Sequence, residues 1–292
     1  MRKDVAFIYS MVIITFFALI FTADYYIENW PSEVYVVPEY AYMFVIVPSF
    51  VIFVMSVIIG YYAHKALKVS GPEETPGIRA LYDFMILWAL IAFETFLGWL
   101  YFYLTKNSLC FVEILGIKVY VWYVAHAWFF PIIGGIAYSI LNLGLWIGRK
   151  QSKLLNGIEL FLLVLVSICL FLPWNYWSFS PPREGLFTRP LVYGISMIAG
   201  VIACIPGIKN LRERLKKKLS KIEAFRYKIL MAGFISIIIF WVFLFLYCIA
   251  LAMNYEILSY LLLGISGLGA GLSPIFLYLG LLTPAWLLKR IS

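Results

Sequence analysis

A carboxylate and an imidazole stand out as the residues best placed to do chemistry inside this chain. Glu94 sits in the middle of a long apolar stretch, and His126 lies in the next one. A carboxylate at the centre of a bilayer costs about 2.5–3.5 kcal/mol on insertion scales, so it usually faces the interior of a helix bundle. A rise of about 1.5 Å per helical residue puts both residues at a similar depth. We expect Glu94 and His126 to form a ligand-binding or proton-sensing pair. The alternative is a protonated Glu94 that is hydrogen-bonded within the bundle.

Few other residues have the spacing that catalysis or a cofactor needs. The four cysteines lie far apart without CxxC or Cys/His spacing, which argues against a zinc site or a disulfide framework. His64 and His126 are separated by ~20 Å along the membrane normal, which disfavours a haem between them. No lysine lies in the middle of an apolar stretch, which excludes a retinal Schiff base. Asp83 and Glu159 lie near the ends of their stretches, where we expect them to reach water or a lysine. We therefore expect no enzyme activity, no metal and no cofactor.

Composition places nearly the whole chain in lipid. The 292 residues are 64% hydrophobic and 13% charged, with a mean hydropathy of +0.93, whereas a soluble domain carries about 25% charge. An apolar run of about 20 residues crosses the hydrocarbon core as a helix, and runs this long satisfy their backbone groups as helices. The predicted fold is an all-α, polytopic integral membrane helix bundle in a single membrane domain, 1–292. Its eight predicted transmembrane helices lie at about 5–22, 41–63, 81–105, 119–147, 157–174, 189–208, 229–253 and 257–286. The first is interpreted as a retained span rather than a signal peptide, because it is too long and no cleavage site follows it.

The basic residues define one orientation in the membrane. Of the 23 lysines and arginines, 19 lie at the two termini and in the gaps after spans two, four and six. The positive-inside rule therefore predicts that the N-terminus and the C-terminus are both cytoplasmic, in a multi-pass protein of the cell membrane. Aromatic residues gather at the opposite boundary, as an interfacial belt does. They are Tyr25, Tyr26, Trp30, Tyr40, Tyr42, Trp122, Tyr123, Trp174, Tyr176 and Trp177.

Small residues mark the last span. Gly267 and Gly271 form a GxxxG step, which lets helix backbones approach closely. Pro274 removes a backbone hydrogen bond and is expected to kink the helix. We expect this segment to provide close packing; the alternative is a hinge that transmits motion to the C-terminus.

A basic segment at 209–228 separates spans six and seven. Leucines and Ile222 recur there at helical spacing among nine basic residues. This pattern predicts a helix that lies on an anionic membrane surface, or a segment that only enforces topology. Nucleic-acid binding is disfavoured because no recognition motif accompanies the charge. The predicted surface-binding residues are Arg212, Arg214, Lys216, Lys217, Lys218 and Lys221.

The C-terminal quarter carries a family resemblance. From Glu223 the chain reads EAFRYKILMAGF, and after two spans it reads YLGLLTPAWLLKR, ending at Arg290. A basic loop, two spans and this Tyr-Leu-Gly, Pro, Trp-Leu and basic pattern resemble the end of the seven-helix membrane sensor region of sensor histidine kinases. The match covers about residues 223–290. It departs from the family because we count eight spans and because the kinase residues are absent from this sequence.

Three functions follow as hypotheses. The first is a stand-alone membrane sensor or receptor that binds a small or lipophilic ligand in an outward-facing aromatic cavity. Its expected partners are the lipid bilayer and a cytoplasmic or membrane signalling protein. The second is a secondary transporter or proton-coupled carrier that uses Glu94. The third is a structural membrane subunit of a larger complex.

Overall fold

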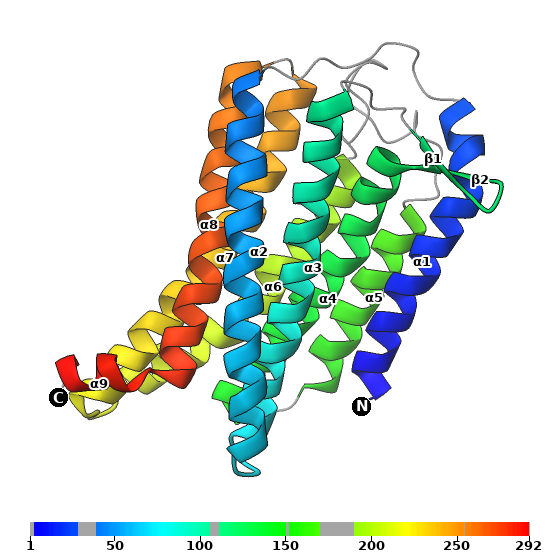
Figure 1. Cartoon of the computed structure of the whole chain (residues 1–292). Coiled ribbons are helices and arrows are strands. Elements are labelled where there is room, and N and C mark those ends of the chain that lie inside the picture. Colours follow the sequence, from blue (N-terminus) through cyan, green and yellow to red (C-terminus); the bar gives the residue numbers. More distant parts are fainter. Residues whose placement is uncertain are drawn as a thin grey trace.

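Helices dominate the computed structural model, which describes residues 3–28, 39–105, 111–149, 152–169, 190–253 and 255–291. The helices are α1 (Lys3–Glu28), α2 (Glu39–Val69), α3 (Thr75–Thr105), α4 (Val121–Ile147), α5 (Lys153–Cys169), α6 (Pro190–Leu215), α7 (Lys221–Ala252), α8 (Glu256–Leu282) and α9 (Ala285–Ile291). Two short strands, β1 (Phe111–Ile114) and β2 (Ile117–Tyr120), precede α4. Helices α1 to α8 follow the eight predicted stretches in order (Figure 1). The prediction of an all-α helix bundle is therefore confirmed.

Six helices form a ring of neighbours around the core. In the ring α2 packs on α3, α3 on α4, α4 on α6, α6 on α7, α7 on α8, and α8 returns to α2. Helices α1 and α5 flank the ring, both against α4 (Figure 1). Aromatic rings fill the centre: Trp88 stacks on Phe84 with centroids 5.1 Å apart and meets Phe240 edge-on at 5.0 Å.

Five helices in the described part of the chain, α2, α3, α6, α7 and α8, are long and apolar enough to cross a membrane. A shorter apolar helical stretch, Pro131–Ile147, belongs to α4. Large apolar side chains remain exposed along the outer faces of α2 and α8, including Met43, Val47, Leu261 and Leu268. Apolar surface on this scale needs a nonaqueous neighbour, and lipid supplies one. The chain is accordingly membrane-embedded.

Pro274 lies inside α8, at a position where it removes one hydrogen bond of the helix. A proline cannot donate to the carbonyl four residues earlier, which here belongs to Ala270. That carbonyl instead accepts the indole N–H of Trp88 at 3.1 Å and the hydroxyl of Ser273 at 3.3 Å. The lost hydrogen bond of the helix is thus replaced, and the bond from Trp88 links α8 to α3. The feature supports packing rather than motion.

The predicted packing role of Gly267 and Gly271 is wrong. A Cβ at Gly267 would meet nothing within 4 Å, and one at Gly271 would only touch Ile52 at 3.9 Å. The close approach of α8 to α7 uses Gly269 instead, where a Cβ would come within 2.7 Å of the backbone of Phe240. The rotation of α8 about its own axis decides which of its glycines lie against α7. The sequence left that rotation undetermined, because small residues occur on every side of the helix.

A different GxxxG step makes a close helix crossing. A Cβ at Gly144 of α4 would lie 2.6 Å from the backbone nitrogen of Gly207 on α6. One turn later, Gly148 leaves room for Asn210, whose amide donates to the Gly144 carbonyl at 2.9 Å. Sequence analysis did not single out this step, although its spacing is the same.

The β-hairpin is an element that sequence analysis missed. Strands β1 and β2 pair antiparallel, with Phe111 opposite Tyr120. Their two-residue turn places Leu115 at φ 54° and Gly116 at φ 78°, the left-handed pair that a type I′ turn requires. Residues 119 and 120 therefore belong to β2, and the fourth helix starts at Val121 rather than at 119.

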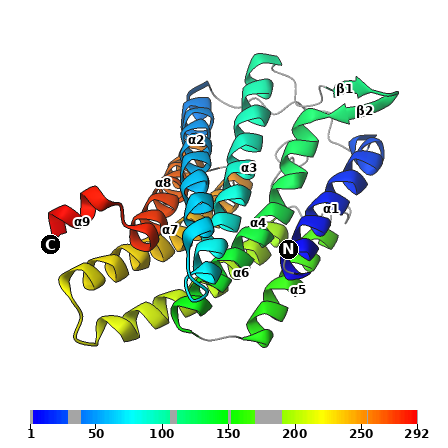
Figure 2. The same ribbon diagram turned by 60° about the horizontal axis from the view of Figure 1, so that its bottom comes forward.

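We define the basic end of the bundle as the end formed by the α2–α3, α4–α5 and α6–α7 connections and by α9. Helix α1 begins on the same side (Figure 1). The predicted helix within 209–228 is interrupted: α6 continues through Leu215, residues 216–220 form the connection, and α7 begins at Lys221. That this segment lies on a membrane surface stays a prediction. The ends of α6 and α7 run together as a hairpin away from α2 and α3 (Figure 2). Leu211 and Leu215 therefore continue α6 and Ile222 belongs to α7, whereas Leu219 lies in the connection.

The last predicted span is shorter than expected. Helix α8 ends at Leu282, because Pro284 disfavours helical geometry at the preceding Thr283. Helix α9 then turns to the side (Figure 2). It exposes Trp286, Lys289 and Arg290, a combination typical of a helix at a membrane–water boundary.

Candidate functional site

A cavity of about 980 Å³ opens at the basic end, between six helices. The size is at the upper end of the range of about 300–1,000 Å³ for small-molecule sites. Its lining comes from both sides of the bundle: Glu73, Glu74, Pro76, Asn142, Leu145, Trp146, Ile147, Arg149, Ser152, Lys153, Asn156, Arg214, Glu223, Arg226, Tyr227, Leu230, Gly280 and Leu281. We call it the basic-end cavity.

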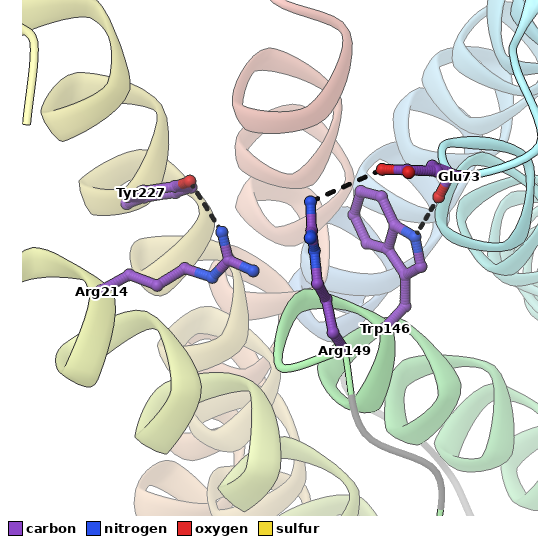
Figure 3. A network of polar contacts seen from close by, with 5 residues as sticks. All are labelled: Glu73, Trp146, Arg149, Arg214 and Tyr227. Carbon is purple, nitrogen blue, oxygen red and sulfur yellow. Dashed lines mark hydrogen bonds and ion pairs between the residues drawn. The ribbon is translucent and has the colours of Figure 1, made fainter.

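Two arginines from different helices extend into the same space (Figure 3). Arg214, near the end of α6, donates to the Tyr227 hydroxyl at 3.1 Å. Arg149, just after α4, lies 3.5 Å from a Glu73 carboxylate oxygen, and both of these side chains are largely exposed. Both arginines also line a second, adjoining cavity of about 470 Å³. The region between them is therefore cationic and open to solvent.

Arg226 has a structural task in the cavity wall. Its Nε donates to the carbonyl of Gly280 at 3.2 Å, and its Nη2 donates to that of Leu281 at 2.7 Å. These carbonyls belong to the last turn of α8, where the helix leaves them without internal partners. One side chain of α7 therefore caps α8 directly before the chain turns into α9.

Local sequence signals position these side chains. Ser220 and Glu223 form a capping box at the start of α7: the Ser220 hydroxyl accepts the N–H of Glu223 at 3.2 Å, and Glu223 Oε2 accepts the N–H of Ser220 at 3.0 Å. From that start, Arg226, Tyr227 and Leu230 recur at helical spacing and line the cavity.

The opposite wall is held by Trp146. Its indole N–H donates to the carbonyl of Glu73 at 2.8 Å. Its ring lies against the start of α3, where a Cβ at Gly77 would come within 2.4 Å of it. The α2–α3 connection is thus fixed to the end of α4. This places the carboxylate of Glu73 beside Arg149 (Figure 3).

Glu94 lies in α3 with its carboxylate turned into the bundle. Its Oε2 is buried and has no hydrogen-bond partner among the described residues. The group lies near enough to Tyr193 of α6 to interact with it electrostatically. His126 belongs to α4, but its side chain lies outside the described residues, so the pairing of Glu94 with His126 stays a prediction.

Glu159 is the more deeply buried carboxylate. Only 1% of it is exposed, and within the described part of the chain neither carboxylate oxygen has a hydrogen-bond partner. The expectation that Glu159 reaches water or a lysine is therefore wrong, because the side chain turns inward toward Cys204 of α6. Asn156, one turn nearer the basic end on α5, lines the cavity and also carries a buried, unpartnered oxygen.

The structure separates the six predicted surface-binding residues. Arg214 is half-buried and lines the basic-end cavity. The other five, Arg212, Lys216, Lys217, Lys218 and Lys221, are exposed, and of these Lys217 lines the adjoining cavity. Sequence analysis missed Arg149, Lys153 and Arg226 as cavity residues, since a basic residue near a helix end is explained by topology alone.

The expected outward-facing aromatic cavity falls outside what the structure describes, because the side chains of all ten belt residues do. Among the described residues no group of three or more His, Cys, Asp and Glu side chains is arranged to hold a metal. Scans against protein-family models, curated proteins and solved structures each found no match.

Proposed function

We propose that this chain is a multi-pass membrane sensor or receptor that binds a small ligand in the basic-end cavity and acts through a protein partner. In this proposal all eight helices α1 to α8 cross the cell membrane, and both termini and the cavity face the cytoplasm. The 19 basic residues of the two termini and of the gaps after spans two, four and six support the orientation. The resemblance of residues 223–290 to the sensor region of histidine kinases supports the class.

One observation carries the proposal: a cavity of ligand size is bounded by the ends of six helices and includes Arg226, which holds the end of α8. A ligand that enters this cavity contacts the residues that fix α8, and α9 follows directly. Ligand binding in the cavity can therefore change the position of α9, an exposed helix that a protein partner can contact.

Native mass spectrometry of the detergent-purified protein tests ligand binding. We expect a non-covalent adduct on the wild-type chain that is lost in Glu74→Trp, which adds bulk at the exposed rim of the cavity. Arg79→Trp is the matched control, because Arg79 is exposed near the start of α3, the helix that follows Glu74, and does not line the cavity. An adduct that survives Glu74→Trp, or no adduct on the wild-type chain, contradicts the proposal.

A proton-coupled carrier is the second candidate, favoured by the buried carboxylates of Glu94 and Glu159. Ionisable residues buried in membrane segments often mark proton relays. Proteoliposomes with an imposed pH gradient and an internal pH dye separate the two candidates. A sensor should give no protein-dependent proton flux. If Glu94 and His126 form a sensing pair, Glu94→Gln should alter the ligand response of that sensor while leaving the fold intact. Flux that is abolished by Glu94→Gln or Glu159→Gln would establish the carrier instead.

A further inference from the structure

We propose that the basic-end cavity binds a phosphate-bearing small molecule, with the phosphate held between Arg149 and Arg214. This inference rests on the proposed ligand-binding role of the cavity and names the chemistry of its ligand. The starting observation is that two guanidinium groups, from the ends of α4 and α6, line the same two adjoining cavities (Figure 3).

Two like charges that share a partly enclosed space repel each other, and an anion between them removes that repulsion. Each guanidinium also keeps hydrogen-bond donors for a ligand. Arg214 uses Nη1 on the Tyr227 hydroxyl, and Arg149 approaches Glu73 through Nη2 alone. A guanidinium has five N–H donors in a planar fork that matches phosphate oxygens, so both arginines retain donors suited to phosphate.

The acidic residues of the two linings are outnumbered by the cations. Glu73, Glu74 and Glu223 line the basic-end cavity with Arg149, Lys153, Arg214 and Arg226, and Glu213 and Glu223 line the adjoining cavity with Arg149, Arg214 and Lys217. Glu223 is already bound by its capping serine, since its Oε2 accepts both the N–H and the hydroxyl of Ser220. Glu73 is placed beside Arg149 by its own backbone contact with Trp146. Glu74 is exposed at the rim. Lys153 adds a further cation to the lining on the α5 side.

The remaining volume identifies the kind of phosphate compound. A cavity of about 980 Å³ is much larger than a phosphate ion. Its deeper wall is apolar, with Leu145, Leu230 and Leu281. A phosphate monoester with an apolar or aromatic body fits both features. Such a group comes either from an inner-leaflet phospholipid or from a soluble phosphate ester.

Calorimetric titration of the full-length protein, purified in a sugar-based detergent, tests the inference. The probes are inorganic phosphate, glycerol 3-phosphate, dihexanoyl phosphatidic acid and dihexanoylglycerol. We expect binding of the phosphate monoesters and none of dihexanoylglycerol. Tighter binding of the phosphatidic acid than of glycerol 3-phosphate, by about tenfold or more, assigns the ligand to the lipid. Similar binding of the two assigns it to a soluble ester.

Variants locate the site. Arg214→Gln should weaken binding by about tenfold or more, the usual effect of losing a charged hydrogen bond. Arg212→Gln is the matched control, because Arg212 lies two residues away on α6, is exposed and lines neither cavity; it should leave binding unchanged. Tyr227→Phe removes the partner of Arg214 but keeps the cation, so binding should persist.

Three results would overturn the inference. The first is the absence of binding by any phosphate probe. The second is an equal loss in Arg212→Gln and Arg214→Gln, which would mean that only the general positive surface attracts the probes. The third is an equal loss in Tyr227→Phe and Arg214→Gln, which would assign the effect to the α6–α7 contact. If mass spectrometry shows an adduct in the cavity and no phosphate probe binds, the phosphate assignment fails while the sensor proposal stands.

Discussion

At the scale of single residues, the buried polar groups decide how this bundle is held together. In lipid an unpaired polar atom finds no water, so each one needs a partner from the protein or carries a cost. The Ala270 carbonyl receives no hydrogen bond from Pro274, and it accepts hydrogen bonds from Trp88 and Ser273 instead. The carboxylate of Glu159 has no such partner in the described part of the chain. The two cases predict opposite effects of mutation.

Trp88→Phe should destabilise the protein by about 1–3 kcal/mol, because it leaves the carbonyl of Ala270 short of a donor in the core. In a Pro274→Ala background, the new N–H at 274 can supply that donor. The same Trp88→Phe change should then cost about 1 kcal/mol less. Thermal melting of the four proteins in detergent gives this double-mutant cycle. If the stability changes of the two substitutions are additive, Trp88 stabilises the protein through its volume alone.

Glu159→Leu should raise stability by about 1–3 kcal/mol, because a side chain of similar size replaces a buried carboxylate that has no hydrogen bond to any described residue. Glu213→Leu, at an exposed position of α6, is the control and should change stability by no more than about 0.5 kcal/mol. Chemical or thermal unfolding measures both. A clear loss of stability in Glu159→Leu would mean that the carboxylate makes an interaction that the bundle depends on.

At the scale of helices, contacts between backbones set the geometry. Helices α4 and α6 meet at Gly144 and Gly207 with no room for a side chain. Van der Waals packing at such crossings is a main source of helix association in lipid. The crossing also positions two residues of the cavity wall. Arg149 follows Gly148 at the end of α4, and Arg214 lies one turn beyond Asn210 on α6.

Gly144→Ala should destabilise the protein by about 1–3 kcal/mol, because overpacking forces two backbones apart. Gly267→Ala, at the other GxxxG step, should be neutral or stabilise by up to about 1 kcal/mol, because alanine favours the helix and nothing lies within 4 Å. Thermal melting compares the pair. Equal destabilisation by both substitutions would contradict the assigned rotation of α8.

Arg226→Gln should loosen the junction of α8 with α9, since it removes charged hydrogen bonds to the carbonyls of Gly280 and Leu281. Each such bond is worth about 1.5–3 kcal/mol. Limited proteolysis should cut the C-terminal segment faster in this variant. Lys228→Gln, an exposed neighbour on α7, should behave like the wild-type chain. Unchanged cleavage in Arg226→Gln would show that the cap does not hold α9.

At the scale of the whole molecule, the basic end and the membrane orientation belong together. In the described part of the chain, the helix ends and connections at the basic end together carry most of the basic residues, and the cavity lies there. If all eight helices cross the membrane, as we propose, both termini lie on that side. The proposed partner would therefore meet α9 and the α6–α7 hairpin from the cytoplasm.

Cysteine labelling in intact cells tests this orientation. Cys110 lies in a gap that we predict to be outside, and Cys169, Cys204 and Cys248 are buried. A membrane-impermeant maleimide should therefore label the wild-type chain at Cys110. In a Cys110→Ser background, Ser292→Cys should be labelled only after the cells are made permeable. Labelling of position 292 in intact cells would overturn the predicted topology.

The sequence by itself determined that this is a helical membrane protein, where its long helices lie and which end is basic. These properties depend on the length of apolar runs and on the count of charges between them, and both are local. Glu94 was also identified from sequence, because a carboxylate within an apolar run is conspicuous wherever it points. The β-hairpin could have been found from its alternating residues and the Leu115–Gly116 turn.

Only the tertiary structure decided how each helix is rotated. A helix that is apolar on all sides carries no polar face to mark its buried side, since lipid and protein interior are equally apolar. For that reason Gly144, rather than Gly267, makes a close crossing, and Glu159 turns inward. For the same reason Arg149 and Arg226 join Arg214 around one cavity, although the sequence spreads them over three helix ends.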